Sequence, residues 1–214
     1  MKKLIISLNI IGLVLLSNTM IAQDNELLAF HSPNKNYESY SMESFGEFNW
    51  ADPSSYGTVN LNGQTWLAKN LNVKVMESWC ADNNPSNCSD YGRLYSWKAA
   101  RLACQKLGPG WRLPTDSEWR EMTEAFGGNV DKGGSSEAFR MLIDGGRGSF
   151  DAQLGGWRDS SGTFYSMGHD GFYWSSTTAN SDVARGYSFN EPVNVVFRAT
   201  GQKDWGFSCR CVKD

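Results

Sequence analysis

The five cysteines are the residues of this chain whose chemistry depends most directly on spacing. Cys80 and Cys88 bracket the stretch ADNNPSN, whose polar, turn-forming residues bring its ends together at low entropic cost, so we expect them to form a disulfide. Cys104 falls late in a helical pattern, whereas Cys209 and Cys211 alternate near the C-terminus. One of these two should pair with Cys104, which leaves the other as a buried, inert thiol.

A second group of residues suits the recognition of a ligand. In the stretch GGWRDSSG, Trp157 and Arg158 fall on a glycine-flanked turn. An exposed indole beside a guanidinium can stack on a sugar ring or bind a carboxylate. Tyr173 and Trp174 offer two more rings, of which strand alternation should turn one inward. We therefore name Trp157 and Arg158 as candidate ligand-binding residues, with packing in the core as the alternative for each ring.

The residue types that catalysis requires are sparse. His31 lies in an irregular segment, and His169 stands beside Asp170 without a serine or cysteine nucleophile in a recognisable setting. The zinc-binding patterns H-E-x-x-H and C-x-x-C are missing from the sequence. We therefore expect a protein that is not an enzyme.

These candidate residues need a framework of helices. Apolar residues recur every three or four positions over residues 91–107, which predicts an amphipathic helix that the following Gly-Pro-Gly ends. In the stretch GWRLPTDSEW, the pattern T-x-x-E predicts a capping box and a second helix over about 115–126. Trp111 and Trp119 should bury at the corner between the helices, whereas Asp116 should lie at the surface. A short third helix is expected over 135–143.

The remaining elements are predicted strands. Residues 58–61 and 64–68 read as a hairpin around the turn Asn62-Gly63. Beyond Gly145, short apolar runs are cut by Gly, Ser, Asp and Asn, which predicts an antiparallel sheet rich in hairpins. In the last strand Phe207, Cys209 and Cys211 should face inward, and Ser208 and Arg210 outward. The fold class is therefore α+β, with helices early and strands late.

The N-terminal residues predict export. Two lysines, an apolar stretch and Ala22 before QDNE are typical of a signal peptide over residues 1–22. Its removal changes the formal net charge from −3 to −5, which argues against a nucleic-acid groove. Residues 23–56 lack periodicity and suit a linker or loosely docked tail, so the domain should cover residues 57–214. We expect no transmembrane span in the mature chain.

Five blocks of sequence resemble one family of exported bacterial proteins, the Fibrobacter succinogenes major paralogous domain, over roughly Gly57 to Asp214. This resemblance implies a C-type lectin-like fold, with two main helices around a small, looped antiparallel sheet and a disulfide from the first helix to the last strand. The blocks, in order, are GQTWLAKNLN, CADNNPSNCSDYGRLYSW, GWRLPTDSEW, LGGWRDSSGTFYSMGHDGFYWSST and WGFSCRCVKD.

The resemblance also implies which C-terminal cysteine is paired. Family members usually end in a pattern like G-F-S-V-R-C-V, so Cys211 matches the paired cysteine and Cys209 replaces an inward aliphatic residue. The expected pair is therefore Cys104–Cys211. The chain departs from the family at Cys104, which lies seven residues before Trp111, where family members have four.

A calcium site is the cofactor that the resemblance suggests. C-type lectins bind calcium and sugar through a Glu-Pro-Asn loop, and NEPVN, from Asn190 to Asn194, is similar to that loop. Glu191, Asn194 and Asn190 are the candidate ligands. Val193 is inserted and the accompanying Trp-Asn-Asp is missing, so the alternative is a proline-containing turn between two strands.

The sequence therefore predicts a secreted or cell-surface binding module for an extracellular glycan or protein ligand, with no cofactor unless calcium is used. One alternative is an enzyme related in fold to the formylglycine-generating enzymes, because GFSCRC is similar to their C-terminal G-F-R-C-like strand and they use a pair of reactive cysteines. Another alternative is a structural scaffold or adhesion component.

Overall fold

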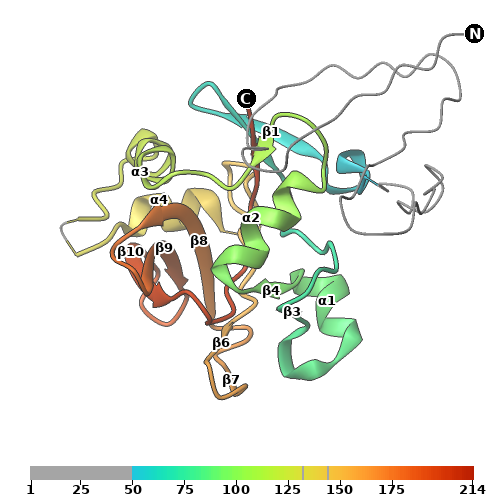
Figure 1. Ribbon diagram of the computed structural model, residues 1–214. Coiled ribbons are helices and arrows are strands. Elements are labelled where there is room, and N and C mark those ends of the chain that lie inside the picture. Colours follow the sequence, from blue (N-terminus) through green and yellow to red (C-terminus); the bar gives the residue numbers. More distant parts are fainter. Residues whose placement is uncertain (1–49, 132, 144) are drawn as a thin grey trace, which may run out of the picture. The chain divides into compact units, whose positions relative to one another are not determined.

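The structure, a computed structural model, describes residues 50–131, 133–143 and 145–214 (Figure 1). The predicted signal peptide, residues 1–22, and residues 23–49 of the predicted linker lie outside the described residues.

The longest strands form an antiparallel sheet in the order β10-β9-β8. β8 spans Asp170–Thr178, β9 spans Val183–Asn190 and β10 spans Val195–Gln202, and all three are orange to red in Figure 1. Their register is antiparallel throughout, with an irregularity between Trp174 and Thr178. The sheet confirms the hairpin-rich, antiparallel second half expected from the sequence.

A second sheet joins the start and the end of the domain in the order β1-β2-β11-β5. The predicted first hairpin is confirmed, because β1 and β2 pair around Asn62 and Gly63, whose φ angles of 50° and 82° fit a two-residue hairpin turn. The C-terminal strand β11 lies between β2 and β5. The strands are β1 (Thr58–Leu61), β2 (Gln64–Leu67), β5 (Trp111–Arg112) and β11 (Val212–Lys213).

Two short hairpin-like pairs and several helical segments complete the described residues, which are thus a mixed α/β domain with small antiparallel sheets. The short strands are β3 (Ser78–Trp79) with β4 (Leu94–Tyr95), and β6 (Trp157–Arg158) with β7 (Phe164–Tyr165). The helical segments are η2 (Pro53–Tyr56), η3 (Ala81–Asn83), α1 (Pro85–Tyr91), α2 (Trp97–Gln105), α3 (Asp116–Ala125) and α4 (Ser136–Leu142).

The first helix begins later than its periodicity predicts. Residues 91–107 were expected to be one helix, but Gly92 adopts φ of 75° and ends α1, and Leu94–Tyr95 pair with β3 as a strand. The Ser96 side chain then accepts a hydrogen bond from the Ala99 N–H and caps α2. The cap, which the sequence pattern does not reveal, sets the start of the helix.

The second and third helices are confirmed. In α3 the Thr115 side chain accepts from the Glu118 N–H, and the Glu118 carboxylate accepts from the Thr115 N–H, as the predicted capping box requires. α4 falls within the predicted stretch 135–143 and is capped by Ser135. Trp111 and Trp119 are buried as expected.

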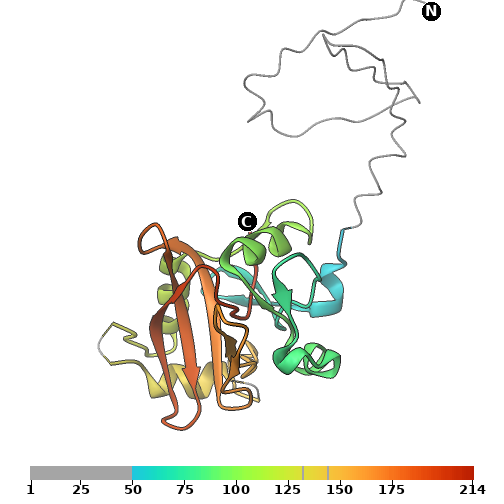
Figure 2. The ribbon, with the colours of Figure 1, turned by 60° about the horizontal axis from the view of Figure 1, so that its bottom comes forward.

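β8 separates two hydrophobic clusters. Tyr173 packs in a cluster with α3 and α4, and Trp174, the next residue, packs in a second cluster with α2 and the C-terminal segment. Figure 2 shows α4 (yellow) and α2 (green) on different sides of the orange and red strands. Packing in the core, the alternative given for each ring, is therefore confirmed for both, because both faces of this strand are covered and neither ring has any exposed surface.

Two disulfides cross-link the domain in the expected pairs. Cys80 is bonded to Cys88, and Cys104 in α2 is bonded to Cys211 just before β11. Cys209 is the free thiol and is fully buried. The chain thus ties its first long helix to its last strand, as the family resemblance implies.

The outward orientation expected for Ser208 and Arg210 is wrong. Both side chains are fully buried, like their neighbours, because the segment runs between the two clusters instead of along a surface. Arg210 lies with its guanidinium 4.4 Å from the Phe150 ring and donates hydrogen bonds to the Asn70 side chain and to backbone carbonyls. Those carbonyls belong to Leu67, Phe150 and Asp151.

The segment before Gly57 belongs to the same unit as the rest of the domain, Trp50–Asp214. The Ala51 N–H donates to the Lys106 carbonyl at 2.8 Å, and the Asn72 N–H donates to the Tyr56 hydroxyl at 3.3 Å. Within the described part of the chain, helices that are long and apolar enough to cross a membrane are absent.

Candidate functional site

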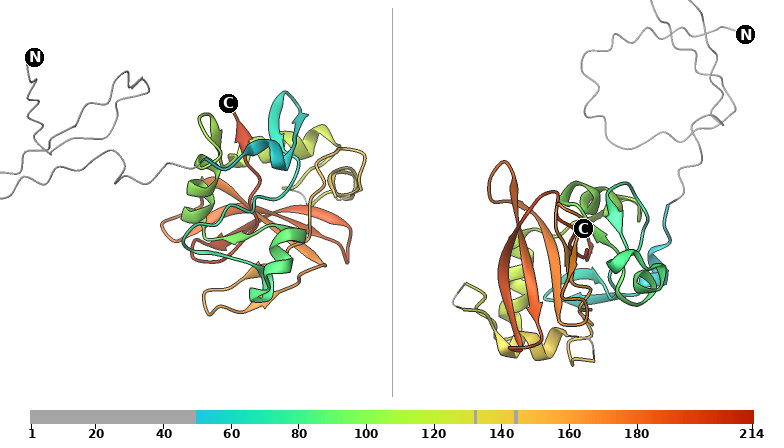
Figure 3. Two further views of the ribbon diagram at one scale, coloured as in Figure 1. Left: turned by 90° about the vertical axis from the view of Figure 1, so that its right-hand side faces the viewer. Right: turned by 90° about the horizontal axis from the view of Figure 1, so that it is seen from below.

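The candidate residues Trp157 and Arg158 lie on β6, in a hairpin with β7 rather than on an isolated turn. Figure 1 and the left view of Figure 3 show this hairpin projecting from the domain. Its turn is held by Asp159, whose carboxylate accepts from the Ser161 hydroxyl (2.6 Å), the Thr163 N–H (2.9 Å) and the Tyr165 hydroxyl. The Ser161 hydrogen bond is the main cause that lowers the pKa of Asp159 to about 2.

The Trp157 ring is partly exposed and contacts other aromatic rings on the same surface. Its centroid lies 4.6 Å from that of Tyr165, in a stacked arrangement, and 4.8 Å from that of Trp205. Tyr165 is 40 % exposed and Trp205 is partly exposed. Trp157 therefore forms the middle of an aromatic group that reaches from the hairpin to the C-terminal loop.

Arg158 is fixed in front of a second tryptophan. Its guanidinium lies 4.1 Å from the Trp79 ring centroid and donates to the Asp159 carbonyl at 3.1 Å. Its backbone pairs in both directions with Gly206, at 2.9 and 2.8 Å. A Cβ on Gly206 would lie 3.1 Å from the Arg158 Cβ and 3.2 Å from the Trp79 ring. Glycine thus allows this close approach of hairpin and loop.

A fourth tryptophan, Trp97 at the start of α2, lies next to the same loop. The Trp97 backbone N–H donates to the Lys203 carbonyl at 2.9 Å, and the Lys203 ammonium lies 5.0 Å from the Trp97 ring centroid. That ammonium also donates to the Asn180 and Ser181 carbonyls. Partly exposed aromatic side chains therefore lie on loop 203–206 and next to it, and we call them the aromatic belt: Trp79, Trp97, Trp157, Tyr165 and Trp205.

The predicted calcium loop is the hairpin turn between β9 and β10. The Asn190 side chain accepts from the Val193 N–H and donates to the Asp170 carboxylate, so the turn uses one of the side chains expected to bind the ion. Asn194 adopts φ of 53° and donates its N–H to the Glu191 carbonyl. The geometry thus assigns Asn190 to the turn, and calcium ligation by Glu191 and Asn194 stays a prediction.

His169 and Asp170 have different partners. The His169 Nδ1 lies 4.0 Å from the Glu191 carboxylate, and both side chains are more than half exposed. The Asp170 carboxylate instead accepts from the Asn190 amide at 2.7 Å. Among the described residues, one group of His, Cys, Asp or Glu side chains has metal-binding spacing, and it is the buried set Cys104, Cys209 and Cys211.

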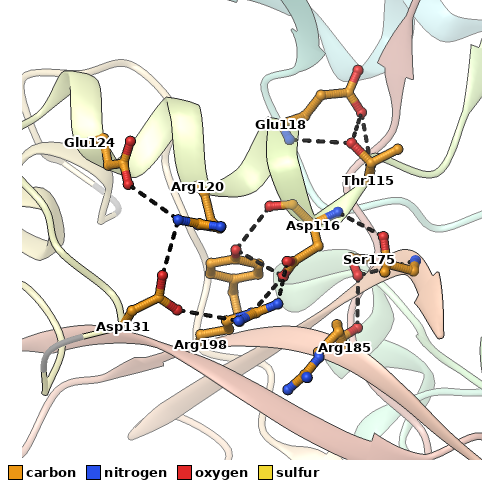
Figure 4. A network of polar contacts seen from close by, with 11 residues as sticks. Thr115, Asp116, Glu118, Arg120, Glu124, Asp131, Ser175, Arg185 and Arg198 are labelled. Carbon is orange, nitrogen blue, oxygen red and sulfur yellow. Dashed lines mark hydrogen bonds and ion pairs between the residues drawn. The ribbon is translucent and has the colours of Figure 1, made fainter. Parts of the chain in front are cut away.

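A polar network around α3 links several charged side chains in close contact (Figure 4). Arg198 on β10 donates two hydrogen bonds to the Asp116 carboxylate and also binds Asp131, which binds Arg120. The Tyr187 hydroxyl donates to the Asp116 carboxylate at 3.1 Å. Burial is the main cause that raises the pKa of Tyr187. Asp116 and Asp131 are each paired with an arginine, so the network is suited to joining α3 to the sheet.

The expected surface position of Asp116 is wrong. The sequence placed it at the surface as an ordinary cap residue, but it is 7 % exposed and its partner Arg198 lies 82 positions away in the chain. Trp79, Trp97 and Trp205 were also not named as site residues. Local spacing carries no signal that would gather them, because they come from three separate elements.

One open depression accompanies these features, outside the aromatic belt. It has a volume of about 200 Å³ and lies between the first hairpin turn and α3. Its lining is mixed, with Leu61 and Met122 next to Gln64 and the carboxylates of Glu118 and Glu121. Since Glu118 is already bound to Arg112 and Thr115, the depression offers few free polar groups for a ligand.

The fold and this surface define a disulfide-linked, mixed α/β domain with aromatic side chains gathered on one region of its surface. The chain belongs to the Fibrobacter succinogenes major domain family, whose model matches residues 59–213. No match to the chain is found among curated proteins or among solved structures.

Proposed function

We propose that this protein is an exported, non-catalytic binding module that recognises a glycan on the aromatic belt. The observation that carries the proposal is the gathering of five partly exposed aromatic rings on loop 203–206 and next to it. Large aromatic side chains that keep part of their surface in contact with solvent are typical of binding sites, because they offer apolar area at low entropic cost.

The polar groups beside the belt complement a sugar. The C–H faces of a sugar ring stack on indole and phenol rings, whereas its hydroxyls need donors and acceptors close by. The Asp159 carboxylate lies next to Tyr165, and the guanidinium of Arg158 lies over Trp79. The belt is held by cross-strand and loop hydrogen bonds, so little ordering would be required on binding.

The proposal includes a C-type lectin-like fold. It is supported by α2 and α3 packed on the β8-β9-β10 sheet and by the Cys104–Cys211 bond from α2 to the C-terminal strand. It also includes export to the cell surface or medium. Two disulfides in a small domain are typical of an oxidising compartment, in agreement with the expected signal peptide.

The enzyme alternative would require Cys209, whose sulfur lies near the Cys104–Cys211 bond, to be the reactive residue. A reactive cysteine requires an accessible thiolate. Burial raises the pKa of the Cys209 thiol, and its side chain has no exposed surface. These properties favour binding over catalysis at this position.

The proposal is tested with a glycan array on residues 23–214, in calcium and again in chelator. We expect one class of glycan to bind and Tyr165→Ala to weaken that binding about tenfold. Trp50→Ala, which removes a tryptophan that is 52 % exposed outside the belt, is the matched control and should leave binding unchanged.

Three outcomes decide between the alternatives. If binding is lost in chelator, the result would support Glu191 and Asn194 as calcium ligands. Binding that persists in Tyr165→Ala would show that the glycan contacts another surface and not the belt. A wild-type chain that binds no glycan in either buffer would overturn the proposal in favour of a scaffold or adhesion component with a protein partner.

A further inference from the structure

Three sulfur atoms lie together in the cluster that includes α2. The Cys209 Sγ lies 3.3 Å from the Cys104 Sγ and 3.9 Å from the Cys211 Sγ, and the latter two atoms form the disulfide. All three side chains are fully buried. A free thiol is thus in contact with both ends of a disulfide.

The backbone holds both C-terminal cysteines at the same site. The Leu71 N–H donates to the Cys209 carbonyl at 2.9 Å, and the Leu67 N–H donates to the Cys211 carbonyl at 3.0 Å. Cys104, on α2, faces both of them. The fold therefore offers Cys104 two partners without a change in the strand register.

We propose that Cys104 has two alternative disulfide partners and that the protein interconverts the Cys104–Cys211 and Cys104–Cys209 forms by internal thiol–disulfide exchange. The Cys209 thiolate attacks the Cys104 sulfur, the Cys104–Cys211 bond breaks, and Cys211 leaves as a thiolate that takes up the proton lost by Cys209. One S–S bond forms and one breaks, so the exchange needs no oxidant or reductant.

The exchange requires a local rotation. If Cys209 were in line with the disulfide, the farther sulfur would lie about 2 Å beyond the nearer one. The distances of 3.3 and 3.9 Å instead place Cys209 beside the bond. A rotation of the Cys209 side chain during local opening would bring the sulfur into line, so we expect interconversion to be slow compared with side-chain motion at the surface.

The protonation of Cys209 also limits the rate. Burial raises the pKa of this thiol, and the nearby Arg210 lowers it in part. Tyr56 and Tyr95, on neighbouring elements, are the other ionisable groups that interact with it. The population of thiolate therefore grows as the pH rises, and equilibration is best followed in mildly alkaline buffer.

Trypsin distinguishes the two forms because Arg210 separates the two cysteines. Cleavage after Lys and Arg places Cys104 in LACQK, Cys209 in DWGFSCR and Cys211 in CVK. The full chain is kept dilute at about pH 8.5 without any added thiol or oxidant, so that only internal exchange can change the pairing and the thiolate population is larger than at neutral pH. Free thiols are then alkylated in acidic denaturant, and the linked peptides are measured by mass spectrometry.

The expected result is both linked pairs, LACQK with CVK and LACQK with DWGFSCR. Absence of the second pair from the equilibrated wild-type chain would overturn the proposal. Because any scrambling during digestion would also alter Cys80–Cys88, linkage of either of those cysteines to DWGFSCR identifies a digest that must be repeated at lower pH.

Two matched variants give an independent reading. Cys211→Ser should form Cys104–Cys209 and leave no alkylatable thiol, and Cys209→Ser should keep Cys104–Cys211 and also leave none. If Cys104 and Cys209 are both alkylated in folded Cys211→Ser, the proposal is wrong. Should that variant not fold, the wild-type peptides alone decide.

Discussion

Asp116 at the start of α3 and Arg198 on β10 form a two-point ion pair that joins the helix to the sheet (Figure 4). The Asp116 side chain is 10 % exposed and that of Arg198 is 25 % exposed. In such surroundings a charge that loses its partner keeps most of its desolvation cost. The pair therefore matters more for stability than the exposed ion pairs of the same network.

Asp116→Asn should lower the free energy of unfolding by about 2 to 3 kcal/mol, because Arg198 loses its charged partner and Tyr187 loses an acceptor. Asp131→Asn is the control and should cost less than about 1 kcal/mol, since its carboxylate is more exposed. Urea unfolding of both variants measures the difference. Equal losses would show that the Asp116–Arg198 pair has no special weight.

Arg210→Met should lower the free energy of unfolding by about 3 to 5 kcal/mol. The substitution keeps an unbranched side chain but leaves the Asn70 side chain and several buried carbonyls without their donor. Arg140→Met, at a side chain that is 68 % exposed, should change the same quantity by less than about 0.5 kcal/mol. A small loss for Arg210→Met would mean that water replaces the guanidinium.

Glu118 should make the free energy of unfolding depend on pH in the acidic range. Burial raises the pKa of its carboxyl, but hydrogen bonds from Arg112 and Thr115 outweigh burial and hold the pKa below its ordinary value. A depressed pKa in the folded protein gives stability that is present above the unfolded pKa and is lost as the pH falls through the folded pKa. Wild type should therefore exceed Glu118→Gln in stability at neutral pH, and the gap should close between about pH 5 and pH 2.

Urea titrations at several pH values measure this gap. A gap that stays constant from neutral pH to about pH 2 would contradict the charge-based account. Glu121→Gln, one turn along α3, is the control, because Glu121 is exposed to solvent and the stability of this variant should follow that of wild type.

Trp157→Ala should lower the free energy of unfolding by about 2 kcal/mol, which is roughly half of a core tryptophan deletion, because the ring is partly exposed. The sequence left open whether this ring is exposed to a ligand or packed in the core. The contacts with Tyr165, Phe172 and Trp205 favour a contribution to packing. Thermal unfolding tests it, and an unchanged Tm would mean that Trp157 contributes to the surface only.

Tyr165→Ala should cost less than about 1 kcal/mol, since 40 % of the side chain is already in contact with solvent. It is therefore the cleaner probe of ligand binding. A larger loss of stability in Tyr165→Ala than in Trp157→Ala would contradict the expectation that Trp157 contributes more to packing than Tyr165.

Local patterns predicted the elements that local chemistry specifies. The capping box fixed the start of α3, the Asn62-Gly63 turn fixed the first hairpin, and the family resemblance selected Cys211 as the partner of Cys104. In each case a few neighbouring residues, or a recognised motif, carry the information.

The features that the sequence did not predict depend on contacts between distant segments. Strand alternation could not show that both Tyr173 and Trp174 are buried, because the cover on the two faces of β8 comes from different parts of the chain. Arg210 was expected at the surface since a charge is seldom buried without partners, and its partners come from loops about 60 and 140 positions away. The aromatic belt was found only in part for the same reason.

The position of β8 between two clusters also bears on how the domain unfolds. Opening either cluster exposes one face of a strand whose other face still belongs to the second cluster. Neither cluster can therefore melt without weakening the other, and the two should behave as one cooperative unit with a single transition. The amides of β8 are then the ones whose hydrogen exchange requires global opening.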